Sequence, residues 1–160
     1  FVGISEEILK KSPFELSGGQ KRRVAIAGVM AMEPKILVLD EPAAGLDPEG
    51  REMILQQVKE YHRSTGTTVL LVSHSMEDIA NYADKVLVMD NARVAMYAET
   101  AKIFAEAPHL LELGLSVPQV TKIFIRLREM GLDIPQDVYT VPYAVKTILA
   151  ARKNAEKGVL

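Results

Sequence analysis

The sequence contains no cysteine and no tryptophan among its 160 residues, and aromatic side chains make up only 6% of it. The absence of cysteine excludes a disulfide framework, a thiolate metal site and a cysteine nucleophile. The same absence is in keeping with a cytosolic protein. An excess of positive charge is also lacking, since the net charge is −2 and no basic tail occurs, so nucleic acid is not expected among the partners.

Long apolar runs are missing as well. The longest spans residues 24–32, far short of the ~20 residues that a membrane-spanning helix needs. It lies inside the chain and lacks a cleavage-site pattern, so we do not interpret it as a signal peptide. Any membrane role is therefore expected to depend on a partner. Apolar residues still make up 48% of the chain, which is enough for a hydrophobic core.

Apolar runs and turn signals predict an α/β fold. The runs at 36–39 and 68–72 are continuous, which is typical of strands covered on both faces of a sheet. A third strand is predicted at 86–89, and the turn at 90–93 leads into a fourth at 94–97. Because helical patterns separate the first three strands, we expect a mostly parallel sheet.

Capping residues mark several of the predicted helices. Asp47 before Pro48 is a favourable helix start, and Gly66 is a favourable end. Ser5 and Ser75 are expected to cap two shorter helices. The predicted helices cover residues 5–11, 21–32, 47–66 and 75–83. The second of these is apolar on most sides after its first turn, so we expect it to be buried.

The character of the chain changes from Thr100 onward, where short helical patterns alternate with proline and glycine. Pro118 and Pro142 suit the first turns of two helices. We therefore predict a partial α/β domain over residues 1–106 and a small helical domain over residues 107–160.

The stretch from Ser17 to Gln20 allows two interpretations. Ser17 as N-cap and Gln20 three residues later form a capping box. The intervening Gly18 and Gly19 weaken a helix start, so capping alone does not explain them. Free amides at a helix N-terminus also suit an anion such as phosphate. The residues alone leave both interpretations open.

Two carboxylates close the first predicted strand. Asp40 suits Mg²⁺, which is usually bound by few carboxylates and several waters, and Glu41 suits a base that polarises an attacking water. His74 follows the next strand, and the carboxyl ends of parallel strands are where α/β sheets bind ligands. The alternative is that the carboxylates only cap a loop and that His74 is structural.

Four segments in this order resemble the ABC (ATP-binding cassette) ATPase family, which has a P-loop NTPase fold. They correspond to a signature motif at 16–20, a Walker B strand with its catalytic Glu at 36–41, a D-loop at 44–47 and a switch-histidine loop at 73–74. The runs 23–28 and 40–48, together with the helical tail, are similar to the ATPase subunits of energy-coupling-factor (ECF) importers of cobalt, nickel and vitamins.

The resemblance implies a role for each candidate residue. In the family, two ATPase subunits close head to tail over two ATP molecules, and each signature helix faces the ATP of its partner. The implied roles are binding of the partner's ATP for Ser17, Gly18, Gly19 and Gln20, Mg²⁺ binding for Asp40, catalysis for Glu41 and His74, and a link between the two sites for Asp47. The implied cofactors are ATP and Mg²⁺.

The resemblance also implies partners and a location. A second ATPase subunit, identical or homologous, would pair with this one, helped by residues 107–160. A transmembrane coupling subunit would hold both at the cytoplasmic face of the cell membrane as peripheral proteins. The transported solute depends on the membrane partner and is not predicted from this sequence.

Some features depart from the family pattern. The chain begins at Phe1 without Met and has no G-x-x-x-x-G-K-[ST], so we interpret it as the C-terminal part of an ABC ATPase that would not hydrolyse ATP alone. Ala43 stands where Thr is usual, and Ala92 and Ala98 stand where Gly is common. Two alternatives remain: an ABC ATPase of DNA repair or chromosome maintenance, against which the lack of sustained heptads argues, and a non-catalytic dimerisation fragment.

Overall fold

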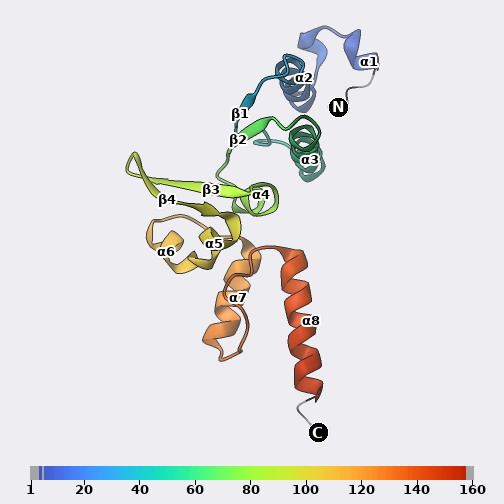
Figure 1. Ribbon diagram of the computed structural model, residues 1–160. Helices are drawn as coiled ribbons and strands as arrows, with labels where there is room; N and C mark the ends of the chain where they lie inside the picture. Colours follow the sequence, from blue (N-terminus) through green and yellow to red (C-terminus); the bar gives the residue numbers. More distant parts are fainter. Residues whose placement is uncertain (1–3, 5, 158–160) are drawn as a thin grey trace. The chain divides into compact units, whose positions relative to one another are not determined.

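The computed structural model describes residue 4 and residues 6–157, with side chains as far as residue 153 (Figure 1). The chain divides into two compact units, Phe1–His74 and Ser75–Leu160. The first unit contains α1 (Glu6–Leu9), a short 3-10 helix (Pro13–Glu15), α2 (Gly18–Met30), β1 (Ile36–Asp40), α3 (Pro48–Thr65) and β2 (Thr68–Val72). The second contains α4 (Met76–Tyr82), β3 (Lys85–Asp90), β4 (Arg93–Glu99), α5 (Thr100–Ala105), α6 (Ala107–Glu112), α7 (Gln119–Glu129) and α8 (Val141–Lys157).

The first unit is built on a parallel pair of strands. β1 and β2 pair in register from Ile36 opposite Thr68 to Asp40 opposite Val72, so both strands end at the same edge. Helices α2 and α3 lie on one side of the pair, as Figure 1 shows. The core between them is formed by Ile26, Met30, Leu37, Leu39, Ile54, Val58 and Tyr61. Each fully buried aliphatic side chain of this kind contributes about 1.5–3 kcal/mol.

The strands of this unit are covered on one face only, which contradicts the prediction of two covered faces. Leu37 and Leu39 are buried, whereas Ile36 and Val38 are 64% and 59% exposed. The reason is that successive side chains of a strand point to opposite faces, and α2 and α3 cover one of them. Helix α2 is likewise not buried as predicted, because its Val24 and Val29 are exposed.

The second unit is built on an antiparallel hairpin. β3 pairs with β4, and the two residues that connect them, Asn91 and Ala92, both have positive φ (46° and 60°). A two-residue connection of this kind allows only antiparallel pairing. The α/β class is confirmed, but within the described residues the parallel ladder is confined to β1 and β2.

The core of the second unit crosses the predicted domain boundary at residue 107. Ala107, Leu110 and Val117 pack in one cluster with Val88 of β3 and Phe104 of α5. The division of the chain by contacts therefore falls after His74 and not after residue 106. A helical domain over 107–160 remains a prediction.

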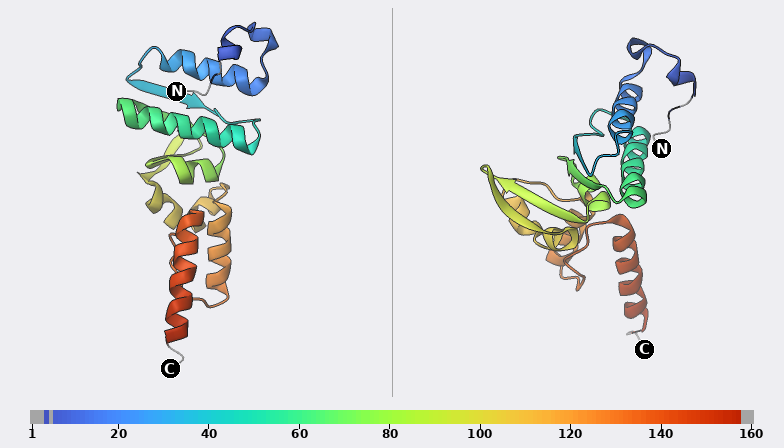
Figure 2. Two further views of the ribbon diagram at one scale, coloured as in Figure 1. Left: turned by 90° about the vertical axis from the view of Figure 1, so that its right-hand side faces the viewer. Right: turned by 45° about the horizontal axis from the view of Figure 1, so that its top comes forward.

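The last two helices share a smaller cluster of their own. α7 and α8 run side by side in Figure 1 and in the left view of Figure 2, and Phe124, Ile134, Val138 and Ala144 are buried together. Partial burial and the nearby Asp137 carboxylate raise the pKa of the Tyr143 hydroxyl.

Most helix ends follow the predicted capping signals. Asp47 is the N-cap of α3, Pro48 is its first residue, and Gly66 ends it with a φ of 70°. Ser75 caps α4 by accepting a hydrogen bond from the amide of Asp78. The predicted cap Ser5 lies outside the described residues. No helix in the described part of the chain is long and apolar enough to cross a bilayer.

Candidate functional site

The N-terminus of α2 forms the predicted capping box. Ser17 Oγ accepts a hydrogen bond from the Gln20 amide at 3.2 Å, and Gln20 Oε1 accepts one from the Ser17 amide at 2.9 Å. Ser17 is exposed, so this helix start is not part of a packed core. The box engages the amides of its two end residues, whereas Gly18 and Gly19 occupy first-turn positions whose amides have no carbonyl within the helix. The geometry therefore fits a cap that still offers amides to an anion.

The edge where β1 and β2 end brings Glu41 and His74 together. The Glu41 amide bonds to the Val72 carbonyl at 2.9 Å, which continues the parallel ladder by one residue. Glu41 then turns into the left-handed region with φ 48°, a conformation that costs a non-glycine residue of order 1–3 kcal/mol. Its carboxylate Oε1 lies 2.8 Å from the His74 amide nitrogen and 2.7 Å from His74 Nδ1.

This pair defines the orientation of both side chains. An ionised carboxylate only accepts hydrogen bonds, so Nδ1 of His74 is the donor, and Nε2 is left for a second partner. The His74 side chain is 83% exposed and that of Glu41 is 32% exposed, so both can reach a ligand from solvent. A carboxylate held in this way could polarise a water molecule, as the sequence predicted for Glu41.

Asp40 ends β1 beside this pair. Its side chain is exposed at the strand end, opposite Val72 of β2. One accessible carboxylate with room for water is a donor set that Mg²⁺ accepts. Within the described residues no group of three or more His, Asp or Glu side chains is close enough to hold a metal ion by itself. Asp40 by itself thus fits at most one ligand position of a Mg²⁺ site.

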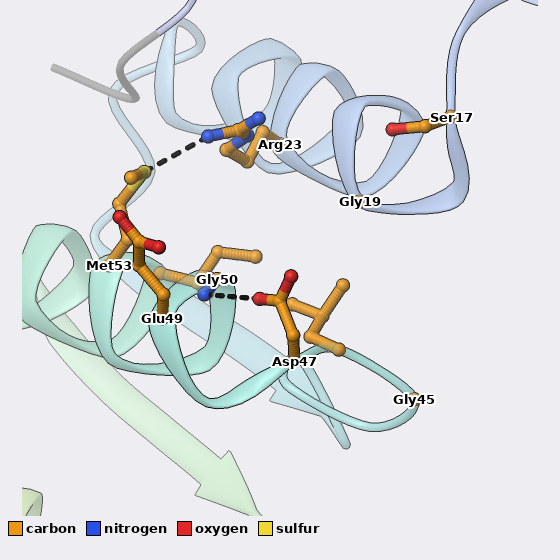
Figure 3. A pocket seen from close by; sticks show the side chains of 10 residues that line it. Ser17, Gly19, Arg23, Gly45, Asp47, Glu49, Gly50 and Met53 are labelled. Atoms are coloured by element: carbon orange, nitrogen blue, oxygen red, sulfur yellow. Dashed lines mark hydrogen bonds between the residues drawn. The ribbon is translucent and has the colours of Figure 1, made fainter.

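A cavity of about 350 Å³ separates the N-termini of α2 and α3 (Figure 3). Ser17 and Gly19 line the cavity at the start of α2, and Asp47 lines it at the start of α3. Oδ1 of Asp47 accepts a 2.7 Å hydrogen bond from the Gly50 amide and so caps α3. Asp40, Glu41 and His74 are not among the lining residues. The structure therefore places Ser17, Gly19 and Asp47 at the α2–α3 cavity and the other three residues at the strand edge. Gly18 and Gln20 belong to the same helix start but do not line the cavity.

Sequence reasoning missed two charged residues of this cavity. Arg23 enters it from α2, with Nη1 2.9 Å from Met53 Sδ, and Glu49 enters it from the first turn of α3 (Figure 3). Arg23 follows Gly19 by four residues, so helical spacing could have placed the two on the same face. Glu49 carried no comparable signal, because its position depends on how α3 approaches α2.

Comparisons with known proteins find relatives that cover most of the chain. The family described as "ABC transporter" matches residues 1–44. The energy-coupling factor transporter ATP-binding protein EcfA2 of Caldanaerobacter subterraneus subsp. tengcongensis is 54% identical over 148 residues, which cover 92% of this chain and 52% of that protein. The chain belongs to the ABC transporter ATPase family. It spans about half the length of the curated relatives that it matches.

Solved structures of ABC ATPases share the fold. One of them is cbiO1 from Clostridium perfringens, which is described as part of the ABC transporter complex cbiONQ. It is 38% identical to this chain with a TM-score of 0.61, and the match covers 81% of this chain and 47% of the cbiO1 chain. A dimeric structure of the ATP-binding cassette MJ0796, bound to ADP and Pi, is 29% identical with a TM-score of 0.56, covering 62% and 42% of the two chains. These matches confirm the predicted family and fold class.

Proposed function

We propose that the protein to which this chain belongs is the ATP-hydrolysing subunit of an ECF-type membrane importer. Support comes from the relative named as an energy-coupling factor transporter ATP-binding protein, and from cbiO1, named as part of a transporter complex. The observation that carries the proposal is the Glu41–His74 pair at the end of a parallel strand pair. Such a pair suits the positioning of a water molecule for phosphoryl transfer, which needs orientation more than covalent chemistry.

The N-terminus of α2 would bind the ATP of a second ATPase subunit. The hydroxyl of Ser17, the side chain of Gln20 and the amides of Gly18 and Gly19 lie where a helix N-terminus attracts phosphate oxygens. Asp47, on the opposite side of the cavity, would link this site to the one served by Glu41. The dimeric arrangement reported for MJ0796 supports a paired assembly.

Glu41 would hold the attacking water at the chain's own nucleotide. His74 orients the Glu41 carboxylate through Nδ1 and would present Nε2 to the phosphate or to the water. Asp40 would supply a carboxylate to Mg²⁺, and the bound ion would neutralise phosphate charge. The lysine and hydroxyl that cradle the phosphates would come from a phosphate-binding loop outside these 160 residues.

The remaining parts of the proposal concern assembly at the membrane. A transmembrane coupling subunit would bind the paired ATPases as peripheral proteins at the cytoplasmic face. Residues 107–160 would help the two ATPases pair, since Val145, Ile148 and Leu149 form an exposed apolar stripe on α8. ATP binding would close the pair and hydrolysis would release it.

Glu41→Gln tests the proposal in the full-length protein assembled with its partner ATPase. The substitution keeps the shape of the side chain and removes its charge, so phosphate release should fall at least ~100-fold while ATP binding is retained. Glu60→Gln, which changes an exposed carboxylate of α3 in the same way, should leave turnover unchanged.

Two results would contradict the proposal. Turnover that survives Glu41→Gln would remove Glu41 from the reaction. Hydrolysis that depends on added DNA, and not on the membrane partner, would favour an ATPase of DNA repair or chromosome maintenance.

A further inference from the structure

Arg22 connects α2 to the segment between the two candidate sites. It lies in the second turn of α2, half-buried, and its Nη1 donates a 2.5 Å hydrogen bond to the carbonyl oxygen of Ala44. Ala44 lies between Glu41 and Asp47 in the chain. Hydrogen bonds with a charged donor are stronger than neutral ones, so this contact attaches an otherwise exposed loop to α2.

A second contact joins the same two segments. A Cβ atom built on Gly19 would lie 3.2 Å from Leu46 Cδ2, so the first turn of α2 rests closely on Leu46. Leu46 in turn packs against the core of the first unit. The start of α2 and the 44–46 segment therefore meet through one steric and one polar contact.

The 44–46 segment needs support from outside. Its own backbone bonds are the 3.2 Å contact from the Ala44 amide to the Glu41 carbonyl and the 3.4 Å contact from the Leu46 amide to the Ala43 carbonyl. Gly45 has φ 72° and is exposed, which adds conformational freedom. Long hydrogen bonds and an exposed glycine together make a segment that a side chain can hold in place.

We propose that Arg22 is a positioning residue that fixes the 44–46 segment against α2. Through this segment the Ser17 helix start, the Glu41 carboxylate and Asp47 keep one arrangement relative to each other. The inference rests on the proposed function and extends it, because Arg22 lies outside the four segments that resemble ABC ATPase motifs. Arg22 itself touches neither nucleotide nor water in this scheme.

Arg22→Met tests the positioning role of Arg22 in the full-length protein assembled with its partner ATPase. The variant keeps the aliphatic stem but removes the donor, so kcat should fall about tenfold, less than the ~100-fold that a 1 Å misplacement can cost. The KM for ATP should stay within about twofold, because groups that bind the ground state are unchanged. Amide hydrogen exchange should become faster in residues 43–48 but not in the body of α2.

Two further variants make the result specific. Arg22→Lys keeps the charge and one donor and should restore most of the activity and the protection of residues 43–48. Lys21→Met removes the exposed charge next to it and should change neither.

An unchanged kcat or unchanged exchange in Arg22→Met overturns the inference, as does an equal effect of Lys21→Met. If the unmodified protein does not hydrolyse ATP, the proposed function fails, while exchange at residues 43–48 still decides whether Arg22 holds the segment.

Discussion

The two compact units of the chain both have a buried core but differ in the residues that they contribute to the candidate sites. In the second unit, large side chains such as Phe104, Phe124 and Val117 are almost fully inaccessible to solvent. In the first unit, Leu37 and Ile54 are buried to the same degree, and each unit also has exposed apolar side chains on its strands, such as Val38 in the first and Met89 in the second. The units differ in that the first contains every residue to which we assign a role in ATP chemistry.

The contacts that hold the candidate residues are therefore distinct from the contacts that form the buried cores. The candidate residues of the first unit are held by capping bonds, by the Glu41–His74 contact and by the Arg22–Ala44 bond. The second unit contains no candidate catalytic residue, and its buried side chains serve packing alone. Substitutions of these candidate residues should therefore alter activity at little cost in stability, and substitutions in the core of the second unit should do the reverse.

The largest effect is expected from Phe104→Ala in the second unit. Phe104 is 1% exposed and stacks on Tyr139 with ring centroids 5.5 Å apart. Removal of a buried aromatic ring costs about 3–5 kcal/mol, because it leaves a cavity as well as losing apolar burial. Urea unfolding of the full-length protein, followed by circular dichroism, measures this loss.

The first unit offers a matched control for this substitution. Phe14 is 92% exposed, so Phe14→Ala should change the free energy of unfolding by no more than about 0.5 kcal/mol. If both substitutions destabilised the protein equally, burial of Phe104 in the core of the second unit would not be the cause of the loss.

An intermediate effect is expected at the exposed stripe of α8. If this helix pairs two ATPase subunits, Ile148→Asp places a charge in an apolar interface and should weaken pairing at least ~10-fold, or about 1.4 kcal/mol. Ala150→Asp adds the same charge to the opposite side of the helix and should leave pairing unchanged. Analytical ultracentrifugation of the full-length variants measures the dissociation constant. Equal dissociation constants for the two variants would show that the α8 stripe does not take part in pairing.

Local features of the fold and site could be predicted from the sequence. The capping box at Ser17 and the α3 start at Asp47 depend on residues within one turn, so short patterns specify them. The meeting of Glu41 and His74 was also predictable, because parallel strands in register end at one edge. These expectations needed no knowledge of distant neighbours.

Features that depend on tertiary neighbours could not be predicted. An all-apolar strand such as β1 does not reveal whether one face or both are covered, because alternation is lost when every residue is apolar. The position of Arg23 in the cavity and the bond from Arg22 to Ala44 depend on how α2 lies against α3. The α2–α3 contact joins residues more than twenty positions apart, for which the sequence holds no short pattern.

The smallest effect is expected at the β3–β4 turn. Ala92 has φ 60°, a left-handed conformation that costs an L-residue roughly 1–2 kcal/mol. Ala92→Gly removes this strain but raises the entropy of the unfolded chain, which costs about 0.5–1 kcal/mol. The free energy of unfolding should therefore rise by up to about 1 kcal/mol. Ala98 lies within β4 and packs against the core, so Ala98→Gly should destabilise the protein. Thermal unfolding of the two variants under the same conditions should therefore give shifts of opposite sign, and two losses would show that the turn at Ala92 is not strained.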